Sequence, residues 1–123
     1  RVYPDYFRQA LLNLLDNAVK YAHRGTQVEV NGNVTNGCGV IRVINFGVRL
    51  SQQDTELIFQ QGFRTQEAMQ QYAAGTGIGL TIARRILEMH NGSLTAEPSQ
   101  QTSAGWKTVF TLSLPLTRVP YRC

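Results

Sequence analysis

Residues 13–21 of the chain read NLLDNAVKY, and residues 75–80 read GTGIGL. The first stretch sets two asparagines and a lysine at helical spacing within an apolar run. The second places three glycines at alternate positions, directly before an apolar pattern of helical period. Glycine lets the backbone approach a ligand closely, and a helix N-terminus presents free amide groups to anions. Together the two stretches indicate a nucleotide site built from the side chains of one helix and the backbone at the start of another.

Helical periodicity extends from the first stretch in both directions. Apolar residues recur at helical intervals from about Tyr6 to Ala22, and Asp5 is a suitable N-cap after Pro4. The rest of the chain predicts, in order, strands over 27–34 and 40–46 joined by turn residues, a short helix including 57–59, a loop over 62–76, a helix over 78–89, and strands over 93–96 and 106–114. A loop is expected between the last two strands, and an irregular tail from Pro115 onward.

Consecutive strands joined by short turns, with the helices grouped, favour an α+β domain over a doubly wound one. We expect a two-layer α/β sandwich, in which about three helices cover one face of a mixed, mainly antiparallel sheet. The 123 residues fit a single domain spanning 1–123. A hydrophobic content of 42% and a charged content of 16% exclude intrinsic disorder.

Composition also narrows the classes of function. The net charge is +4, but the basic residues are scattered, so no nucleic-acid partner is expected. Cys38 and Cys123 lie far apart without metal-ligand spacing, which predicts reduced thiols in a cytosolic setting rather than a zinc site or a disulfide. No apolar run approaches the roughly 20 residues that cross a bilayer, so any membrane attachment is expected in segments outside this chain. The start at Arg1 suggests a domain cut from a longer protein.

Asn13, Asn17, Lys20 and Tyr21 are spaced so that they project from one face of the first helix. Asparagine is unfavourable within a helix, so two of them in a leucine-rich stretch need either buried hydrogen-bond partners or a ligand. An amide oxygen can ligate Mg²⁺, which keeps several waters and relies on substrate phosphates for the rest of its shell. The alternatives are a solvated helix face here and a flexible hinge or tight turn at the glycines.

Taken together, these stretches resemble the catalytic and ATP-binding domain of bacterial two-component sensor histidine kinases, in the GHKL ATPase superfamily. The resemblance covers nearly the whole chain, and the boxes follow the family's order and spacing. Residues 13–21 resemble the N box, 43–50 the G1 box, 58–63 the F box, 75–80 the G2 box, and 108–110 the terminal glycine and threonine box. Several boxes in order are far more specific than any single one.

The resemblance implies a site that binds ATP and Mg²⁺, with Asn17 coordinating the metal. It implies cofactor contacts from Asn17, Lys20, Tyr21, Asn45, Gly47, Gly75, Thr76, Gly77, Ile78, Gly79, Leu80 and Thr108. It implies catalytic roles for Asn13, Lys20 and Arg64. Superfamily ATPases carry a glutamate base at the position of Asn13, and an amide cannot take up a proton as glutamate does. The sequence is therefore better suited to passing phosphate to a protein histidine than to rapid hydrolysis of ATP.

Two residues depart from the family pattern of the G1 box. Asn45 replaces the aspartate that accepts a hydrogen bond from the adenine amino group, and Arg49 replaces the second glycine. Since glycine alone adopts positive φ freely, Arg49 is expected to reshape the loop or narrow the adenine pocket. A degenerate, non-catalytic domain used for protein interaction or sensing is one alternative function. An anti-sigma-type serine kinase is another.

The resemblance also implies partners outside this chain. Neither His23 nor His90 is placed as a phosphoacceptor, so the acceptor histidine is expected on a separate dimerisation domain. The receiver domain of a response regulator would then take the phosphate. The full-length protein is expected to be a homodimer, with this domain in the cytoplasm.

Overall fold

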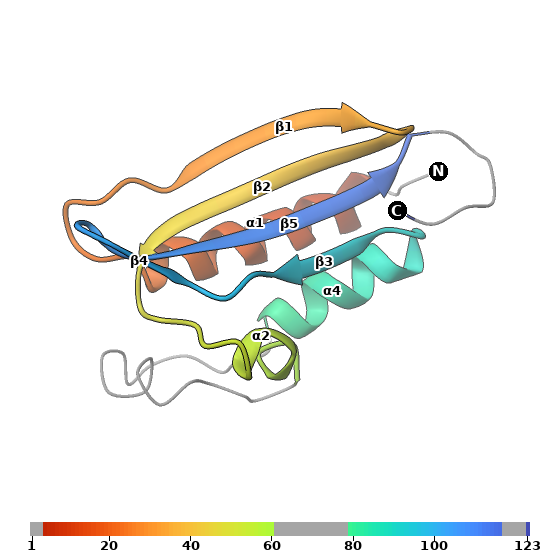
Figure 1. Ribbon diagram of the computed structural model, residues 1–123. Coiled ribbons are helices and arrows are strands. Elements are labelled where there is room, and N and C mark those ends of the chain that lie inside the picture. Colours follow the sequence, from red (N-terminus) through yellow and green to blue (C-terminus); the bar gives the residue numbers. More distant parts are fainter. Residues whose placement is uncertain (1–3, 61–78, 117–122) are drawn as a thin grey trace.

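Helices cover one face of a five-stranded sheet in this computed structural model, which describes residues 4–60, 79–116 and 123 (Figure 1). The helices are α1 (Pro4–Lys20), α2 (Asp54–Leu57) and α4 (Gly79–Met89). The strands are β1 (Glu29–Thr35), β2 (Cys38–Gly47), β3 (Ser93–Ala96), β4 (Gln100–Thr102) and β5 (Gly105–Pro115). α1 and α4 lie side by side against the same face of the sheet (Figure 1). The expected two-layer α+β sandwich is confirmed.

The last strand of the chain lies in the middle of the sheet. The strand order is β1-β2-β5-β3, β4 also pairs with β5, and each of these pairings is antiparallel. The register places Val43 opposite Phe110 and Asn45 opposite Thr108. Directly opposite residues of antiparallel strands project from the same face. These four residues therefore share the face that the helices cover.

Apolar side chains fill the space between the two layers. Along α1, Ala10, Leu14 and Ala18 recur every four residues and are at most 1% exposed, so one face of the helix is fully buried. The sheet and α4 supply the other large, well-buried side chains, namely Val43, Leu87, Leu94, Phe110 and Leu112. Burial of this apolar face fixes the rotation of α1 about its axis. It therefore also decides where the polar stripe of α1, formed by Asn13, Asn17 and Lys20, lies.

The first helix begins at Pro4, so Asp5 lies in its first turn rather than at the expected N-cap. Proline suits this turn because the backbone N–H groups there have no partner within the helix. α1 has 17 residues and carries polar residues along its outer face. Neither it nor any other helix in the described ranges is long and apolar enough to cross a membrane.

α1 ends at Lys20, before the end at Ala22 that its apolar pattern predicts. The residues that follow turn away to pair with the end of β2. The His23 N–H donates to the carbonyl of Phe46 at 2.8 Å, and Ala22 forms an isolated antiparallel bridge with Gly47. Backbone groups that a longer helix would satisfy internally are thus satisfied by the sheet. Tertiary pairing, rather than helix propensity, sets this boundary.

The loop expected between the last two strands contains a further strand, β4. Its residues Gln100–Thr102 are polar and exposed, so they carry no apolar alternation that would reveal a strand. They pair with the first residues of β5, and Gly105 turns the chain with a φ of +119°. The Thr102 hydroxyl adds a hydrogen bond to the carbonyl of Gly105 at 2.6 Å. Backbone pairing and the Thr102 hydroxyl, rather than apolar packing, make this hairpin.

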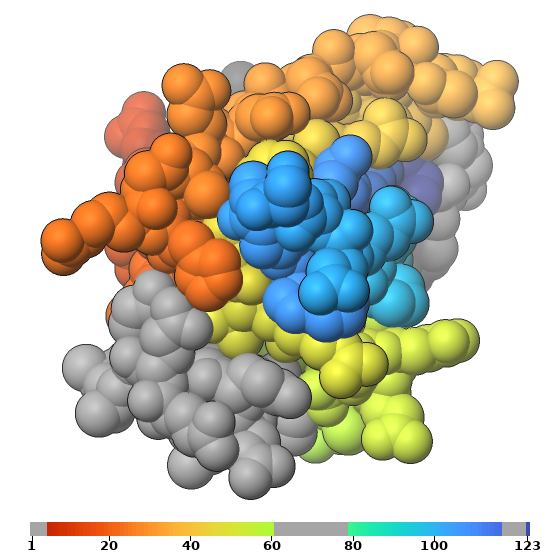
Figure 2. All heavy atoms as spheres, turned by 60° about the vertical axis from the view of Figure 1, so that its left-hand side comes forward, coloured from red at the N-terminus to blue at the C-terminus, as the bar shows by residue number. Residues whose placement is uncertain are grey.

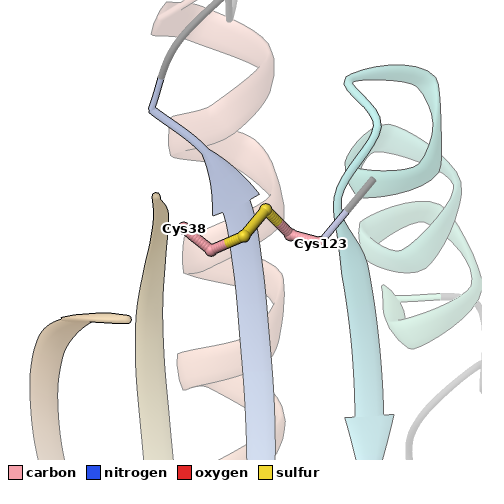
Figure 3. The surroundings of a disulfide bond; sticks show 2 residues. All are labelled: Cys38 and Cys123. Atoms are coloured by element: carbon pink, nitrogen blue, oxygen red, sulfur yellow. A yellow bond between two sulfur atoms is a disulfide. The ribbon is translucent and has the colours of Figure 1, made fainter. Parts of the chain in front are cut away.

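The two cysteines form a disulfide bond, so the expectation of reduced thiols is wrong for this structure (Figure 3). Cys38 begins β2, and the bond reaches Cys123 across β5 from the β2 side to the β3 side (Figure 3). The Cys123 N–H also donates to the carbonyl of Asn91 at 3.0 Å. The cysteines are 85 residues apart in sequence, and only the folded sheet brings them together. The bond lies at the opposite end of β2 from Gly47.

Candidate nucleotide-binding site

The end of β2 packs directly against the residues that follow α1, and Gly47 makes this approach possible. A Cβ placed on Gly47 would collide with the carbonyl oxygen of Tyr21 and would lie 2.9 Å from the Cα of Ala22. The same carbonyl accepts a hydrogen bond from the Val48 N–H at 3.2 Å. Only glycine leaves room for two backbones at this separation. Gly47 thereby holds the polar end of α1 next to the end of β2.

Two buried polar residues face the helices at this end of the sheet. Asn45 is 4% exposed and Thr108 is 3% exposed, and they lie directly opposite each other on β2 and β5. The Thr108 hydroxyl is hydrogen-bonded to the hydroxyl of Ser99. Within the described ranges, no hydrogen bond engages the side-chain amide of Asn45. Buried amides in folded proteins nearly always have partners, so Asn45 is a buried amide whose hydrogen-bonding capacity is unmet among the described residues.

A pair of reciprocal hydrogen bonds fixes the loop after β2. The Leu50 N–H donates to the Ser99 hydroxyl oxygen, and the Ser99 N–H donates to the Leu50 carbonyl, both at 2.8 Å. Because the same Ser99 hydroxyl contacts Thr108, the loop is tied to the buried end of the sheet. Sequence reasoning did not single out Ser99, since a serine in a polar stretch carries no distinguishing signal.

The polar stripe of α1 borders the start of α4. Asn13 and Asn17 are half-buried, and Lys20 is exposed. A Cβ on Gly79, the first residue of α4, would lie 3.9 Å from the Cβ of Asn13, so the start of α4 and the stripe are neighbours. Leu80 is only 7% exposed and belongs to the core, so any contact it makes with a ligand would come from its backbone. The geometry allows phosphate groups to meet amide side chains and helix N–H groups together.

Several sequence-predicted residues lie outside the described residues, namely Arg64, Gly75, Thr76, Gly77 and Ile78. The described residues on either side of this segment are joined to each other. The Thr81 hydroxyl donates to the Phe59 carbonyl at 2.7 Å, and the Arg84 guanidinium lies 4.5 Å from the Phe59 ring centroid. Arg84 also pairs with Glu56 at 2.9 Å. α2, the residues that directly follow it and the first turns of α4 therefore pack together.

The backbone of Arg49 does not adopt the positive φ that glycine would favour. Non-glycine residues with positive φ in the described ranges are Asn36 and Asn91, so the backbone of Arg49 stays in an ordinary region. Its guanidinium lies over the Trp106 ring, 5.0 Å from the centroid, which is within cation–π distance. The backbone at position 49 therefore does not require glycine in this structure. The arginine side chain is exposed and lies against the tryptophan.

Figure 2 shows this end of the molecule, where the segment after α1, the loop after β2 and the β4–β5 hairpin meet. A Cβ on Gly105 would lie 2.7 Å from Cδ2 of His23, so the hairpin turn contacts the segment after α1. No group of three or more His, Cys, Asp or Glu side chains suited to a metal occurs among the described residues. A metal here would depend on amide oxygen and on ligand phosphates, which is a donor set that fits Mg²⁺.

Comparison with known proteins agrees with this geometry. The sequence model of the family described as "Histidine kinase-, DNA gyrase B-, and HSP90-like ATPase" matches residues 3–118. The sensor-like histidine kinase SenX3 of Mycolicibacterium smegmatis is 33% identical over 106 residues, which make up 86% of this chain and 27% of SenX3. The chain thus spans about a quarter of the length of the curated relatives it matches.

Solved structures show the same fold. The catalytic domain of histidine kinase ThkA superposes with a TM-score of 0.77 at 26% identity, covering 94% of this chain and 70% of that one. The mycobacterial sensor histidine kinase MprB gives a TM-score of 0.74 at 27% identity, covering 87% of this chain and 68% of that one. These likenesses confirm the expected histidine-kinase-like ATPase fold.

Proposed function

The chain belongs to the family of histidine kinase-, DNA gyrase B- and HSP90-like ATPases, and on this premise we propose that residues 1–123 are the ATP-binding catalytic domain of a sensor histidine kinase. The domain would transfer the γ-phosphoryl group of ATP to a histidine on a separate dimerisation domain. The observation that carries the proposal is the buried amide of Asn45, which lacks a partner among the described residues. The hydrogen-bonding edge of an adenine would satisfy it.

Phosphoryl transfer requires positioned reactants and neutralised charge more than acid–base chemistry. In this proposal Asn17 holds Mg²⁺ through its side-chain oxygen, Lys20 pairs with a phosphate oxygen, and the first amides of α4 receive phosphate. Bound Mg²⁺ supplies charge neutralisation on the triphosphate. The bond from the γ-phosphorus to its bridging oxygen breaks, a phosphorus–nitrogen bond to the acceptor imidazole forms, ADP leaves, and the imidazole proton is released.

Asn13 supports transfer to a protein rather than to water. Its side chain is half-buried beside the start of α4, where a general base would act on an attacking water. An amide does not accept a proton at neutral pH, so this position cannot activate water. The proposed domain should therefore hydrolyse ATP slowly when no acceptor is present.

The acceptor histidine is proposed to lie on another domain, because both histidines of this chain are half-buried and in contact with other residues of the fold. Nδ1 of His90 lies 2.8 Å from the carbonyl oxygen of Ile86, and His23 contacts the turn at Gly105.

The remaining proposed partners are a response-regulator receiver domain and a second copy of the full-length protein. A cytoplasmic location, where ATP is available, is part of the proposal. Nucleic acid has no part in the proposal.

Replacing Asn17 with alanine is expected to remove the Mg²⁺-dependent part of ATP binding. The variant keeps the fold, because alanine is the most favourable helix residue and Asn17 is only half-buried. Calorimetric titration with ATP, with and without Mg²⁺, should give the same dissociation constant for the variant in both conditions. The wild type should bind more tightly with Mg²⁺.

Gln9→Ala is the matched control, since it removes an amide from the exposed face of the same helix. It should titrate like the wild type. No binding by the wild type at millimolar nucleotide would contradict the proposed function itself. A retained Mg²⁺ effect in Asn17→Ala would instead contradict the assignment of the metal ligand.

The class of phosphoprotein distinguishes histidine kinase from serine kinase activity. Incubating the domain with ATP and an isolated dimerisation domain should yield a phosphoprotein that loses its phosphate in acid, because the phosphorus–nitrogen bond is acid-labile. An acid-stable product would favour a serine kinase. No product despite ATP binding would favour a non-catalytic domain.

Replacing Arg49 with glycine is expected to change the affinity for Mg²⁺–ATP by less than about threefold, a difference below 1 kcal/mol. The arginine already has an ordinary backbone conformation and lies over Trp106, so removing it opens no strained loop. The measurement is a parallel titration of both proteins. A gain of about tenfold or more would show that Arg49 obstructs the site, as a degenerate domain requires.

A further inference from the structure

We propose that Asn45 gives this domain a nucleobase subsite that accepts two opposite hydrogen-bonding patterns, so that inosine triphosphate binds nearly as well as ATP. The inference rests on the proposed function and names the substrate class of the same site. It concerns 6-oxopurine nucleotides, to which guanosine triphosphate also belongs. The property comes from a single buried side chain and its surroundings.

Among the described residues, no hydrogen bond fixes the orientation of the Asn45 amide. The side chain lies on the helix-facing side of the sheet in a residue that is 4% exposed, and none of the described residues hydrogen-bonds to it. Its neighbour across the strands, Thr108, has its hydroxyl occupied by Ser99. Ser99 is itself held by backbone hydrogen bonds to Leu50. The hydrogen bonds beside Asn45 thus form without it, and no group among the described residues selects which end of the amide points to a ligand.

The chemistry of the amide then decides which bases fit. A carboxylate only accepts hydrogen bonds, so an aspartate at this position would select a base with an amino group at C6. Asparagine carries one acceptor oxygen and an NH₂ donor. Adenine offers a donor at N6 beside an acceptor at N1, whereas hypoxanthine offers an acceptor at O6 beside a donor at N1. A half-turn of the Asn45 amide exchanges its donor and acceptor and complements either edge.

The size of the effect follows from the cost of an unmet hydrogen bond in a buried site, which weakens binding by about tenfold or more. With Asn45, the C6 and N1 groups of both bases have hydrogen-bond partners. The wild-type dissociation constants for Mg²⁺–ATP and Mg²⁺–ITP should therefore agree within about threefold. With aspartate, the carboxylate faces O6 of hypoxanthine, and two acceptors repel. Asn45→Asp should therefore weaken ITP relative to ATP by at least about tenfold.

The test is a calorimetric titration of wild type, Asn45→Asp and Asn33→Asp with ATP, ITP and GTP in the presence of Mg²⁺. Asn33→Asp makes the same chemical change on the exposed edge strand β1, so its ATP-to-ITP ratio should match the wild type. GTP has the same hydrogen-bonding pattern at C6 and N1 as ITP. Its additional 2-amino group tests whether the site has room next to C2 of the base. Circular dichroism melting checks that each variant is folded.

Each outcome separates the inference from the function on which it rests. Wild type that binds ATP but binds ITP at least about tenfold more weakly overturns the inference and leaves the proposed function standing. Wild type that binds neither nucleotide overturns both. Equal ratios in wild type and Asn45→Asp show that Asn45 does not select the base, which also overturns the inference.

A measurement on the wild type alone keeps the inference testable if the aspartate variant does not fold. The side-chain NH₂ signals of Asn45 in a ¹⁵N-labelled sample, identified by their loss in Asn45→Ala, should move on addition of ATP and also on addition of ITP. Movement with ATP alone would overturn the inference.

Discussion

Replacing Gly47 with alanine is expected to lower the free energy of unfolding by about 3 kcal/mol, because the added methyl group has no space to occupy. It would collide with the carbonyl oxygen of Tyr21 and approach the backbone of Ala22 and His23. All three contacts are with backbone, which cannot move aside as a flexible side chain would. Urea denaturation followed by circular dichroism measures the loss. The same variant should bind nucleotide weakly even when folded, since the end of α1 would be pushed away from β2.

Gly32→Ala is the matched control for this prediction. Gly32 is also a strand glycine, but a Cβ there would meet only ordinary contacts, at 3.4 Å from the Val40 carbonyl oxygen and 3.8 Å from Ile41. Its stability should stay within about 0.5 kcal/mol of the wild type. Equal stability of Gly47→Ala and Gly32→Ala would show that the close approach of β2 to the end of α1 is not needed for the fold.

Opening the disulfide between Cys38 and Cys123 is expected to lower the free energy of unfolding by about 4.6 kcal/mol, the chain-entropy value for a loop of this length. The bond closes a loop with a sequence separation of 85, so it removes many conformations from the unfolded chain. Urea denaturation with and without dithiothreitol measures the difference. The midpoint should move to lower urea when the reductant is present.

The double variant Cys38→Ser, Cys123→Ser is the control. It should unfold near the midpoint of the reduced wild type and should not respond to dithiothreitol. Its nucleotide affinity should match the wild type under conditions where both are folded, since the disulfide and the candidate site lie at opposite ends of β2. A wild-type midpoint that is unchanged by the reductant would contradict the prediction.

The sequence was sufficient for the parts of the fold that rest on regular periodicity. α1 follows from apolar residues such as Ala10, Leu14 and Ala18 at a spacing of four, and β3 was predicted with its observed bounds. The polar strand β4 was missed, because its pairing with β5 gives no pattern in its own residues. The pairing of Cys38 with Cys123 was missed because it depends on the tertiary arrangement of β2 and the residues after β5.

In the candidate site, too, some features could be predicted from the sequence and others depend on tertiary contacts. Residue type indicated Asn13 and Asn17, because asparagine is unfavourable within a helix. Asn45 was indicated only by the resemblance to the family's G1 box. The links made by Ser99 to Thr108 and Leu50 could not be predicted, since they join residues that are distant in sequence. Arg49 was expected to reshape its loop or narrow the adenine pocket, and its contact with Trp106 on β5 could not be predicted from the sequence. The chemical type of a site residue can be predicted from the sequence, whereas its contacts with residues distant in sequence cannot.

The position of β5 has a consequence for how the domain is made in the cell. Among the described strands, β5 (Gly105–Pro115) leaves the ribosome after the other four, yet β2, β3 and β4 all pair with it. Until it emerges, β2 and β3 have no common neighbour, and α1 and α4 have no finished sheet to cover. Such long-range pairing slows folding, and exposed strand edges in the nascent chain invite association with other chains. The domain should therefore fold only after synthesis of its last strand, and chaperones that protect unpaired strands should increase its soluble yield.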